Sequence, residues 1–277
     1  MNIIAVDIGN TNITVAVFVN NEEKLIESVR GRAEDARRKL TGLLIGAWQR
    51  FPLVEGATTP QRDGVIVASS VNPAWTDIVA EICQNCLEEK LKLVGKDVPL
   101  PIDTAVDNAM EVGTDRLVAA AAAYAVVEDA VVVADFGTAV TIDLVDSNGT
   151  FMGGVIYPGF DILSKALHEN TAKLPTVHCK KPKGSYGANT VEAINAGMYY
   201  AAIGLLETIT RKYAEELGKW PQTIVTGGAA KVIKDDCEFV DTWVSNLTVH
   251  GVVIAWQKFV EDQAHLAELG NTEESDQ

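Results

Sequence analysis

Polar side chains follow a run of apolar residues near the start of the chain, in "AVDIGNTN" (5–12). Asp7 ends a β-type run, and Gly9 opens a turn of small polar residues. Backbone N–H groups in such a turn can hold phosphate oxygens, and a neighbouring carboxylate can hold water around a divalent cation. The alternative is that these residues only stabilise the turn, as Asp and Asn often do. A single copy of the segment favours that alternative.

A second copy of the segment changes this preference. Asp135 and Gly137, in "VVVADFGTAVTIDLV", each lie 128 residues after Asp7 and Gly9. Both copies stand between an apolar run and a β-rich run, and both are followed by a turn about ten residues later, which suggests a duplicated fold. Two facing acidic hairpins can enclose one polyphosphate and its cations. The repeat therefore favours a phosphate and metal site.

Other nucleotide and nucleic-acid binding classes are disfavoured. The chain has neither GxxxxGK[ST] nor any Gly-x-Gly, so the P-loop and the dinucleotide fingerprint are both missing. The formal charge is −15, from 38 acidic and 23 basic residues. Domains that bind nucleic-acid backbones usually carry a basic face, so only a local basic site is compatible with this charge.

The hydrophobic pattern predicts an α/β chain of two related halves. The first half reads as a meander and then alternating helices and strands, at 3–8, 13–19, 24–30, 34–50, 64–69, 73–87 and 90–95. The second half repeats the strand opening and is richer in helix, with helices at 115–127, 190–217 and 251–269 and a strand at 223–228. We predict domains at 1–112 and 113–269, and a solvated acidic tail at 270–277.

Cysteine, histidine and targeting signals point to no further chemistry. The four cysteines form no disulfide framework, and Cys83 and Cys86 make a single CxxC whose simplest interpretation is buried reduced thiols. The four histidines show no metal-site spacing. No secretory signal or membrane span is recognisable, so we expect a cytoplasmic protein.

The paired hairpins resemble those of the superfamily that contains actin, sugar kinases and heat-shock chaperones. That resemblance implies two duplicated ribonuclease-H-like domains, each a mixed β-sheet flanked by helices. Narrower motifs follow in chain order: "DIGNTN" (7–12), "GTDR" (113–116), "DFGTAVTID" (135–143), "GGVIYPG" (153–159), "TAKLP" (171–175), "GANTVEAINAG" (187–197) and "TGGAA" (226–230). Together they resemble type III pantothenate kinase, from residue 3 to about 255 and most weakly at 20–60.

The resemblance implies an activity and its cofactors. The expected reaction is the ATP-dependent phosphorylation of pantothenate to 4'-phosphopantothenate, the first step of coenzyme A biosynthesis, with Mg²⁺ and with K⁺ or NH₄⁺. A homodimer is expected, with no nucleic-acid or membrane partner. Two alternatives stay open: a non-catalytic regulator like the family's transcription accessory factors, and a kinase of another small alcohol.

The resemblance also assigns residues to roles. ATP contacts are expected at Asp7, Ile8, Gly9, Asn10, Thr11, Asn12, Ile13, Thr14, Thr138, Gly227 and Gly228. Pantothenate contacts are expected at Gly113, Thr114, Asp115, Arg116 and Thr190. Asp115 is the expected catalytic base, Asp135 the monovalent-cation ligand, and Asp7 a magnesium ligand, directly or through water.

Structural alternatives exist for several of these residues. Thr114, Asp115 and Thr190 are also good N-caps, Arg116 could form a surface ion pair, and a double glycine can simply end a strand. The segment before Gly113, "DTAVDNAMEV", departs from the family pattern. It carries Val106 and Ala109 where an aromatic residue and a proline are expected, so the fit of the pantothenate pocket stays open.

Overall fold

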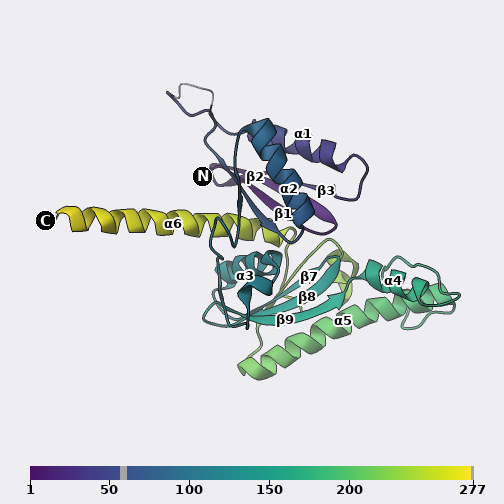
Figure 1. The fold of residues 1–277 in the computed structure, drawn as a ribbon. Helices are drawn as coiled ribbons and strands as arrows, with labels where there is room; N and C mark the ends of the chain where they lie inside the picture. Colours follow the sequence, from purple (N-terminus) through teal and green to yellow (C-terminus); the bar gives the residue numbers. More distant parts are fainter. Residues whose placement is uncertain (57–60, 276–277) are drawn as a thin grey trace. The chain divides into compact units, whose positions relative to one another are not determined.

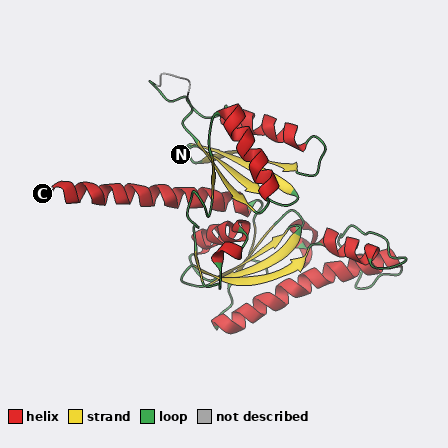
Figure 2. Cartoon of the chain, in the orientation of Figure 1, coloured by secondary structure: helices red, strands yellow, loops and turns green. Residues whose placement is uncertain are grey.

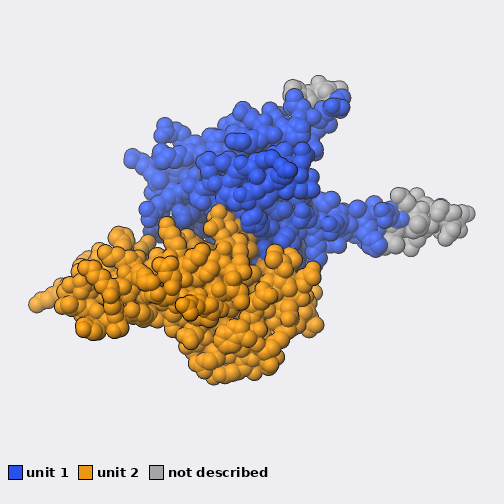
Figure 3. Space-filling model, turned by 180° about the vertical axis from the view of Figure 1, so that it is seen from behind, with its two compact units in different colours: residues 1–102, 108–122, 248–277 blue, residues 103–107, 123–247 orange. Residues whose placement is uncertain are grey.

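The computed structural model describes the backbone at residues 1–56 and 61–275, and side chains as far as residue 268. The chain begins with strand β1 and ends in helix α6, and it contains both strands and helices throughout (Figures 1 and 2). It divides into two compact units, coloured separately in Figure 3. Unit 1 comprises 1–102, 108–122 and 248–277, and unit 2 comprises 103–107 and 123–247. Among the described residues, no helix is long and apolar enough to cross a membrane.

Unit 1 is built on a five-stranded sheet in the order β3-β2-β1-β4-β5. Strands β1, β2 and β3 are antiparallel neighbours, while β4 and β5 run parallel to β1. The strands are β1 (Ile3–Ile8), β2 (Asn12–Val19), β3 (Glu22–Arg30), β4 (Val65–Ser70) and β5 (Leu91–Leu93). The helices are α1 (Ala36–Trp48), α2 (Pro73–Ile82) with a π-helical turn (Cys83–Leu87), a 3₁₀ turn (Ala109–Glu111), α3 (Thr114–Val127) and α6 (Leu247–Ser275).

Helices cover both faces of this sheet, because β1 is apolar at alternate positions on both sides. Ile4, Val6 and Ile8 lie in one cluster with α1 and α2, while Ile3 and Ala5 lie in another with α3 and α6. Helices α3 and α6 approach closely, since a Cβ at Gly251 of α6 would overlap the Val118 carbonyl of α3. Small residues at that contact let the backbones meet.

Unit 2 contains a six-stranded sheet in the order β11-β10-β7-β8-β9-β6. Its strands are β6 (Asp103–Thr104), β7 (Val131–Phe136), β8 (Ala139–Val145), β9 (Thr150–Pro158), β10 (Gln222–Thr226) and β11 (Thr242–Trp243). Its helices are α4 (Phe160–Glu169), α5 (Thr190–Leu217) and two 3₁₀ turns (Ala230–Val232 and Lys234–Asp236). Val132, Ala134 and Phe136 of β7 pack in one core cluster with α4 and α5.

The two sheets repeat one topology. In unit 2, β7, β8 and β9 are antiparallel neighbours, and β10 and β11 run parallel to β7. The order β9-β8-β7-β10-β11 therefore matches β3-β2-β1-β4-β5 of unit 1. This confirms the α/β fold class of two duplicated ribonuclease-H-like domains with mixed sheets flanked by helices.

Some boundaries differ from the linear prediction. Residues 108–122 and 248–277 group with unit 1, whereas we predicted one boundary at 112/113. The predicted tail begins as helix, because α6 continues to Ser275. The predicted helix at 73–87 is α-helical only to Ile82 and ends in a π-helical turn, where Cys83 is buried and Cys86 is exposed. Helix α4 was not predicted.

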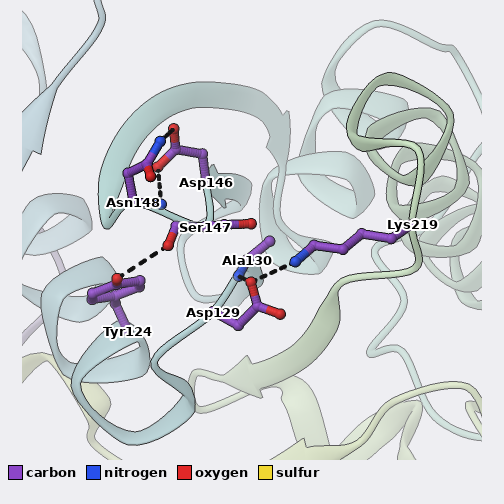
Figure 4. Close-up of polar contacts among 7 residues, drawn as sticks. All are labelled: Tyr124, Asp129, Ala130, Asp146, Ser147, Asn148 and Lys219. Carbon is purple, nitrogen blue, oxygen red and sulfur yellow. Dashed lines mark hydrogen bonds and ion pairs between the residues drawn. The ribbon is translucent and has the colours of Figure 1, made fainter.

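Polar contacts hold the end of the second sheet opposite the Asp135 hairpin (Figure 4). Lys219 donates to Asp129 at 2.5 Å, just before β7 begins, and Tyr124 donates to the Ser147 carbonyl at 3.3 Å in the β8–β9 turn. The hydrogen bond from Lys219 lowers the pKa of Asp129 to about 2. These contacts are exposed, so they contribute little to the stability of the fold.

Candidate active site

Asp7 lies near the carboxyl end of β1, between two hydroxyl residues on neighbouring strands. Its register partners are Thr14 on β2 and Ser69 on β4. Register partners present their side chains to the same face of a sheet. The Asp7 Oδ1 atom is buried, and Thr14 and Ser69 are buried as well. The first acidic position is therefore a shielded oxygen-rich site at a strand end.

The turn after Asp7 is closed by its own backbone. The Gly9 N–H donates to the Asn12 carbonyl at 3.1 Å, and the Thr11 carbonyl accepts from the Gly31 N–H at 2.8 Å. Asn10 and Asn12 are exposed, while Gly9 and Thr11 are half-buried. This arrangement leaves the tip of the hairpin accessible to a ligand.

Ile8 and Ile13 differ from the rest of the predicted ATP-binding segment. Both side chains are fully buried and belong to the core cluster shared with α1 and α2. Any contact that these two residues make with a nucleotide therefore involves the backbone alone.

The second hairpin repeats the first with a turn that is one residue shorter. Asp135 on β7 pairs in register with Thr141 on β8 and Thr226 on β10, as Asp7 does with its two hydroxyl neighbours. The Gly137 N–H donates to the Ala139 carbonyl at 3.0 Å. Unit 2 thus places a second carboxylate between two hydroxyl residues at the matching strand position.

Thr138 forms the tip of this second hairpin. Its carbonyl accepts from the Gly159 N–H at 3.1 Å, which ties the hairpin to the end of the "GGVIYPG" motif. A Cβ at Gly159 would lie 2.5 Å from the carbonyl oxygens of Gly137 and Thr138. Glycine at 159 is therefore required by close backbone packing.

Gly227 follows β10 and packs directly on the second hairpin. Its φ is +99°, and a Cβ there would overlap Asp135 Oδ1 and lie 2.5 Å from the Phe136 nitrogen and carbonyl oxygen. The Ala229 N–H also donates to the Phe136 carbonyl, at 3.0 Å. Gly228, in contrast, faces open space. The double glycine does more than end a strand, because its first member lets the loop lie against Asp135.

The "GTDR" segment begins α3, where Thr114 binds the end of β4. The Thr114 hydroxyl lies 3.0 Å from Ser69 Oγ, accepts from the Ser70 N–H at 3.1 Å and donates to the Ser70 carbonyl at 3.1 Å. This hydroxyl therefore does not cap its own helix, and it is occupied by protein partners. Any pantothenate contact at Thr114 would use its backbone or methyl group.

Asp115 follows Thr114 and is half-buried. Its Oδ1 atom accepts from the Arg116 N–H at 2.8 Å. Burial raises the pKa of Asp115, while the hydrogen bond from the Arg116 backbone and the Arg116 charge oppose that rise. A Cβ at Gly113 would overlap Asp115 Oδ1 and lie 3.3 Å from Val71. The position of this carboxylate thus depends on a glycine at 113.

Thr190 is the first residue of α5, but it is not the cap. Asn189 caps the helix by accepting from the Glu192 N–H at 3.0 Å, and the Glu192 side chain accepts from the Ala188 N–H at 3.0 Å. This pair resembles a capping box, except that Glu192 accepts from the residue before the cap and not from the cap itself. Thr190 is exposed and lines a mostly apolar groove of about 720 Å³ between α4 and α5. Its side chain is not needed for capping and can contact a ligand in this groove.

The atypical segment before Gly113 divides between the two units. Val106 lies in unit 2, 3.5 Å from the position of a Cβ on Gly153. Ala109 lies in unit 1 in a 3₁₀ turn capped by Asn108, and it lines a cavity of about 430 Å³ together with Met110 and Thr114. The cavity walls are mostly apolar, so they suit an apolar part of a ligand.

The sequence missed one feature of the site, at the end of β4, and one buried carboxylate on β8. Ser69 and Ser70 end β4 beside Asp7. Their signal in the sequence is the same as for Asp7: polar residues that directly follow an apolar β-type run. Asp143 is buried, with 2% of its surface exposed, and Gly154 leaves the space that its carboxylate fills. Asp143 and Gly154 both lie in motifs quoted above, but the sequence shows neither their burial nor their contact with each other.

The structure groups the predicted residues within each unit. Unit 1 brings Asp7, its hairpin and "GTDR" to the neighbouring ends of β1 and β4. Unit 2 brings Asp135, Thr138 and Gly227 to the ends of β7 and β10. Within the described residues, no group of three or more His, Cys, Asp or Glu side chains could hold a metal.

Known proteins are similar to this sequence over most of its length. The family model for type III pantothenate kinase matches residues 3–212. A type III pantothenate kinase from Agathobacter rectalis is 34% identical over 267 residues, covering 92% of this chain and 97% of that protein. Another from Dehalococcoides mccartyi is 33% identical over 260 residues, covering 92% of this chain and 97% of that protein.

A solved structure supports the fold independently. A Baf family transcriptional activator from Campylobacter jejuni superimposes with a TM-score of 0.54, at 16% identity, over 95% of this chain and 99% of that one. At this identity the likeness concerns the fold alone. The family assignment comes from the sequence matches, which span both hairpins and "GTDR": the chain belongs to the type III pantothenate kinase family.

Proposed function

We propose that this chain transfers the γ-phosphoryl group of ATP to the primary hydroxyl of pantothenate. The product is 4'-phosphopantothenate, and the reaction is the first step of coenzyme A biosynthesis. The observation that carries the proposal is Asp115, a half-buried carboxylate at the start of α3, in a chain that matches type III pantothenate kinases over 92% of its length. The same unit holds Asp7 and its hairpin.

Asp115 acts as the proton acceptor. An alcohol is far too weak an acid to be deprotonated beforehand by a carboxylate, and phosphoryl transfer has a loose transition state with little early need for charge on the nucleophile. Asp115 therefore orients the hydroxyl and takes its proton late in the step. Burial raises the pKa of Asp115, which makes it a better proton acceptor than an exposed aspartate.

The remaining site residues bind and orient. The hairpin from Asp7 to Thr14 and the hairpin at Thr138 hold phosphate oxygens. The loop of Gly227 and Gly228 contacts the adenosine, with the open space beside Gly228 leaving room for it. Gly113 to Arg116 and Thr190 contact pantothenate. The planar guanidinium of Arg116 suits either a carboxylate or a phosphate.

The carboxylates fit the cations that this reaction needs. Mg²⁺ at phosphoryl-transfer sites is usually held by one or two carboxylates together with substrate phosphates, so Asp7 with its buried Oδ1 is a suitable ligand. Asp135, with two threonine register partners, offers hard oxygens for K⁺ or NH₄⁺. Bound cations would neutralise charge that develops on the transferred phosphoryl group.

A homodimer in the cytoplasm is part of the proposal. The apolar groove along α4 and α5, with Leu163, Leu167 and Ile194 among its lining residues, offers a surface that a second copy could cover. A solution mass near twice 29.7 kDa would agree with a dimer, and a mass of one chain at micromolar concentration would not.

A panel of acceptors tests the function. ADP formation is measured with ATP, Mg²⁺ and K⁺ in the presence of pantothenate, pantetheine or a hexose. We expect ADP only with pantothenate, and a lower rate when Mg²⁺ or K⁺ is omitted. Preferred turnover of another alcohol would replace the substrate assignment. ATP binding without turnover on any acceptor would favour a non-catalytic regulator.

The pH dependence of the reaction follows from Asp115. Only the ionised carboxylate can accept a proton, and a raised pKa means that the protonated form persists to higher pH. We therefore expect kcat/KM for pantothenate to fall on the acid side with an apparent pKa above the ordinary 3.8. An acid limb at or below 3.8 would contradict this assignment.

The raised pKa of Asp115 also affects stability. The unfolding free energy should decrease as pH rises from 3.8 through the folded pKa, because Asp115 ionises at lower pH in the unfolded chain than in the folded one.

A further inference from the structure

Thr114 uses its hydroxyl to join two parts of the site. The oxygen accepts from the Ser70 N–H, donates to the Ser70 carbonyl and lies 3.0 Å from Ser69 Oγ. A hydroxyl has one proton and two lone pairs. Because its proton goes to the Ser70 carbonyl, Ser69 must donate to it, and the bonding capacity of Thr114 is then complete. The first turn of α3 is thereby attached to the last two residues of β4.

Ser69 connects this attachment to the first hairpin. It is fully buried, and it pairs in register with Asp7 on the parallel strand β1. The β1–β4 connection continues past this pair, since the Val71 N–H donates to the Ile8 carbonyl at 3.1 Å. The ends of β1 and β4 that carry Asp7 and Ser69 are therefore held together by backbone hydrogen bonds on both sides of this pair.

Asp115 is fixed on the other side of the same attachment. It follows Thr114 directly, and the space beside its Oδ1 atom is bounded by Gly113, where a Cβ would overlap it. A shift of the first turn of α3 relative to β4 would move this carboxylate while leaving the sheet in place. The bonds of Thr114 to β4 oppose such a shift.

We propose that Ser69 and the Thr114 hydroxyl are positioning residues, which set the placement of Asp115 relative to Asp7 within unit 1. This inference rests on the proposed function, in which Asp7 lies on the ATP side and Asp115 on the acceptor side. Neither Ser69 nor the Thr114 hydroxyl needs to touch a substrate. Their contribution is alignment of the two groups, to which phosphoryl transfer is sensitive.

The test compares Thr114→Val, which keeps the side-chain shape and removes the hydroxyl, with Thr114→Ser, which keeps the hydroxyl. Thr41→Val is the control, because the Thr41 hydroxyl also donates to a backbone carbonyl, that of Arg37 at 2.9 Å, but lies within α1, to which no predicted site residue belongs. Ser69→Ala is a milder variant that removes only one of the three Thr114 contacts. All are assayed well below their melting temperatures, with the folded fraction measured by circular dichroism.

We expect Thr114→Val to lower kcat per folded enzyme by about 100-fold, with both KM values within about threefold of the parent. Thr114→Ser should restore kcat to within about threefold, Ser69→Ala should cost about tenfold, and Thr41→Val should change kcat by less than about twofold. An unchanged kcat in folded Thr114→Val, with only a lower melting temperature, would overturn the proposal.

A readout without turnover separates this inference from the proposed function. The titration of the Asp115 carboxyl, followed by NMR in the absence of substrates, should shift in Thr114→Val and stay unchanged in Thr41→Val. Equal titration curves in Thr114→Val and the parent would overturn the positioning role. Failure of the parent to phosphorylate pantothenate would overturn the proposed function, and would leave the titration to decide the positioning role.

Discussion

Asp115→Asn should lower kcat by about 10²–10⁴-fold, the range that general acid–base catalysis contributes. The amide keeps the size of the side chain and can still accept from the Arg116 N–H, so the start of α3 should hold its conformation. It cannot take the proton of the acceptor hydroxyl. We therefore expect KM for ATP to change little, and steady-state kinetics with ADP detection would measure both constants.

Gly113→Ala is the companion variant for this prediction. A Cβ at 113 would overlap Asp115 Oδ1, so the carboxylate must move although it is chemically intact. We expect kcat to fall, as in Asp115→Asn, by about 10–10²-fold, because misplacement of a catalytic group by about 1 Å can lower the rate by about 10²-fold. Full activity in Asp115→Asn would remove Asp115 as the base. Full activity in Gly113→Ala alone would show that the carboxylate tolerates displacement.

Gly227→Ala should disrupt the second hairpin more than any other glycine change considered at the site. A residue with φ of +99° is strained unless it is glycine, and the added Cβ would overlap Asp135 Oδ1 and crowd the Phe136 backbone at 2.5 Å. Strain and overpacking of this kind each cost about 1–3 kcal/mol. We expect the unfolding free energy to fall by about 2–4 kcal/mol. Urea denaturation would measure it, and ATP affinity should fall as well.

Gly228→Ala supplies the control for that prediction. The neighbouring glycine faces open space, with nothing within 4 Å of an added Cβ, and its φ is not positive. Its replacement should change the unfolding free energy by less than about 0.5 kcal/mol. If Gly228→Ala weakens ATP binding without loss of stability, the open space beside it is nucleotide space. If Gly227→Ala is as stable as the parent, the packing on Asp135 is looser than described.

The duplicated strand pattern could be found in the sequence because a strand end is a local feature. Apolar runs, the Asp-apolar-Gly spacing and the turn at Asn20 and Asn21 are set by residues close together in the chain, and both asparagines adopt the left-handed conformation that this residue tolerates. The motifs that identify the family are equally local. Helix α4 was missed because it follows a strand directly and no strong cap precedes it.

The roles of single hydroxyls and glycines depended on contacts between distant segments. Thr114 and Thr190 both read as N-caps, yet one binds β4, 44 residues away, and the other yields the cap to Asn189. Gly227 lies against Asp135 because β10 and β7 are parallel neighbours, which no spacing in the sequence encodes.

The sequence by itself determined the two acidic strand ends, the duplicated strand pattern, the family and the candidate base, because these depend on residue type and short spacing. The tertiary structure alone decided that the helix carrying Asp115 is attached to the strand beside Asp7, that Ile8 and Ile13 face the core, and that α6 belongs with unit 1. Each of these is a contact between residues far apart in the chain, and such contacts exist only after the sheet has formed.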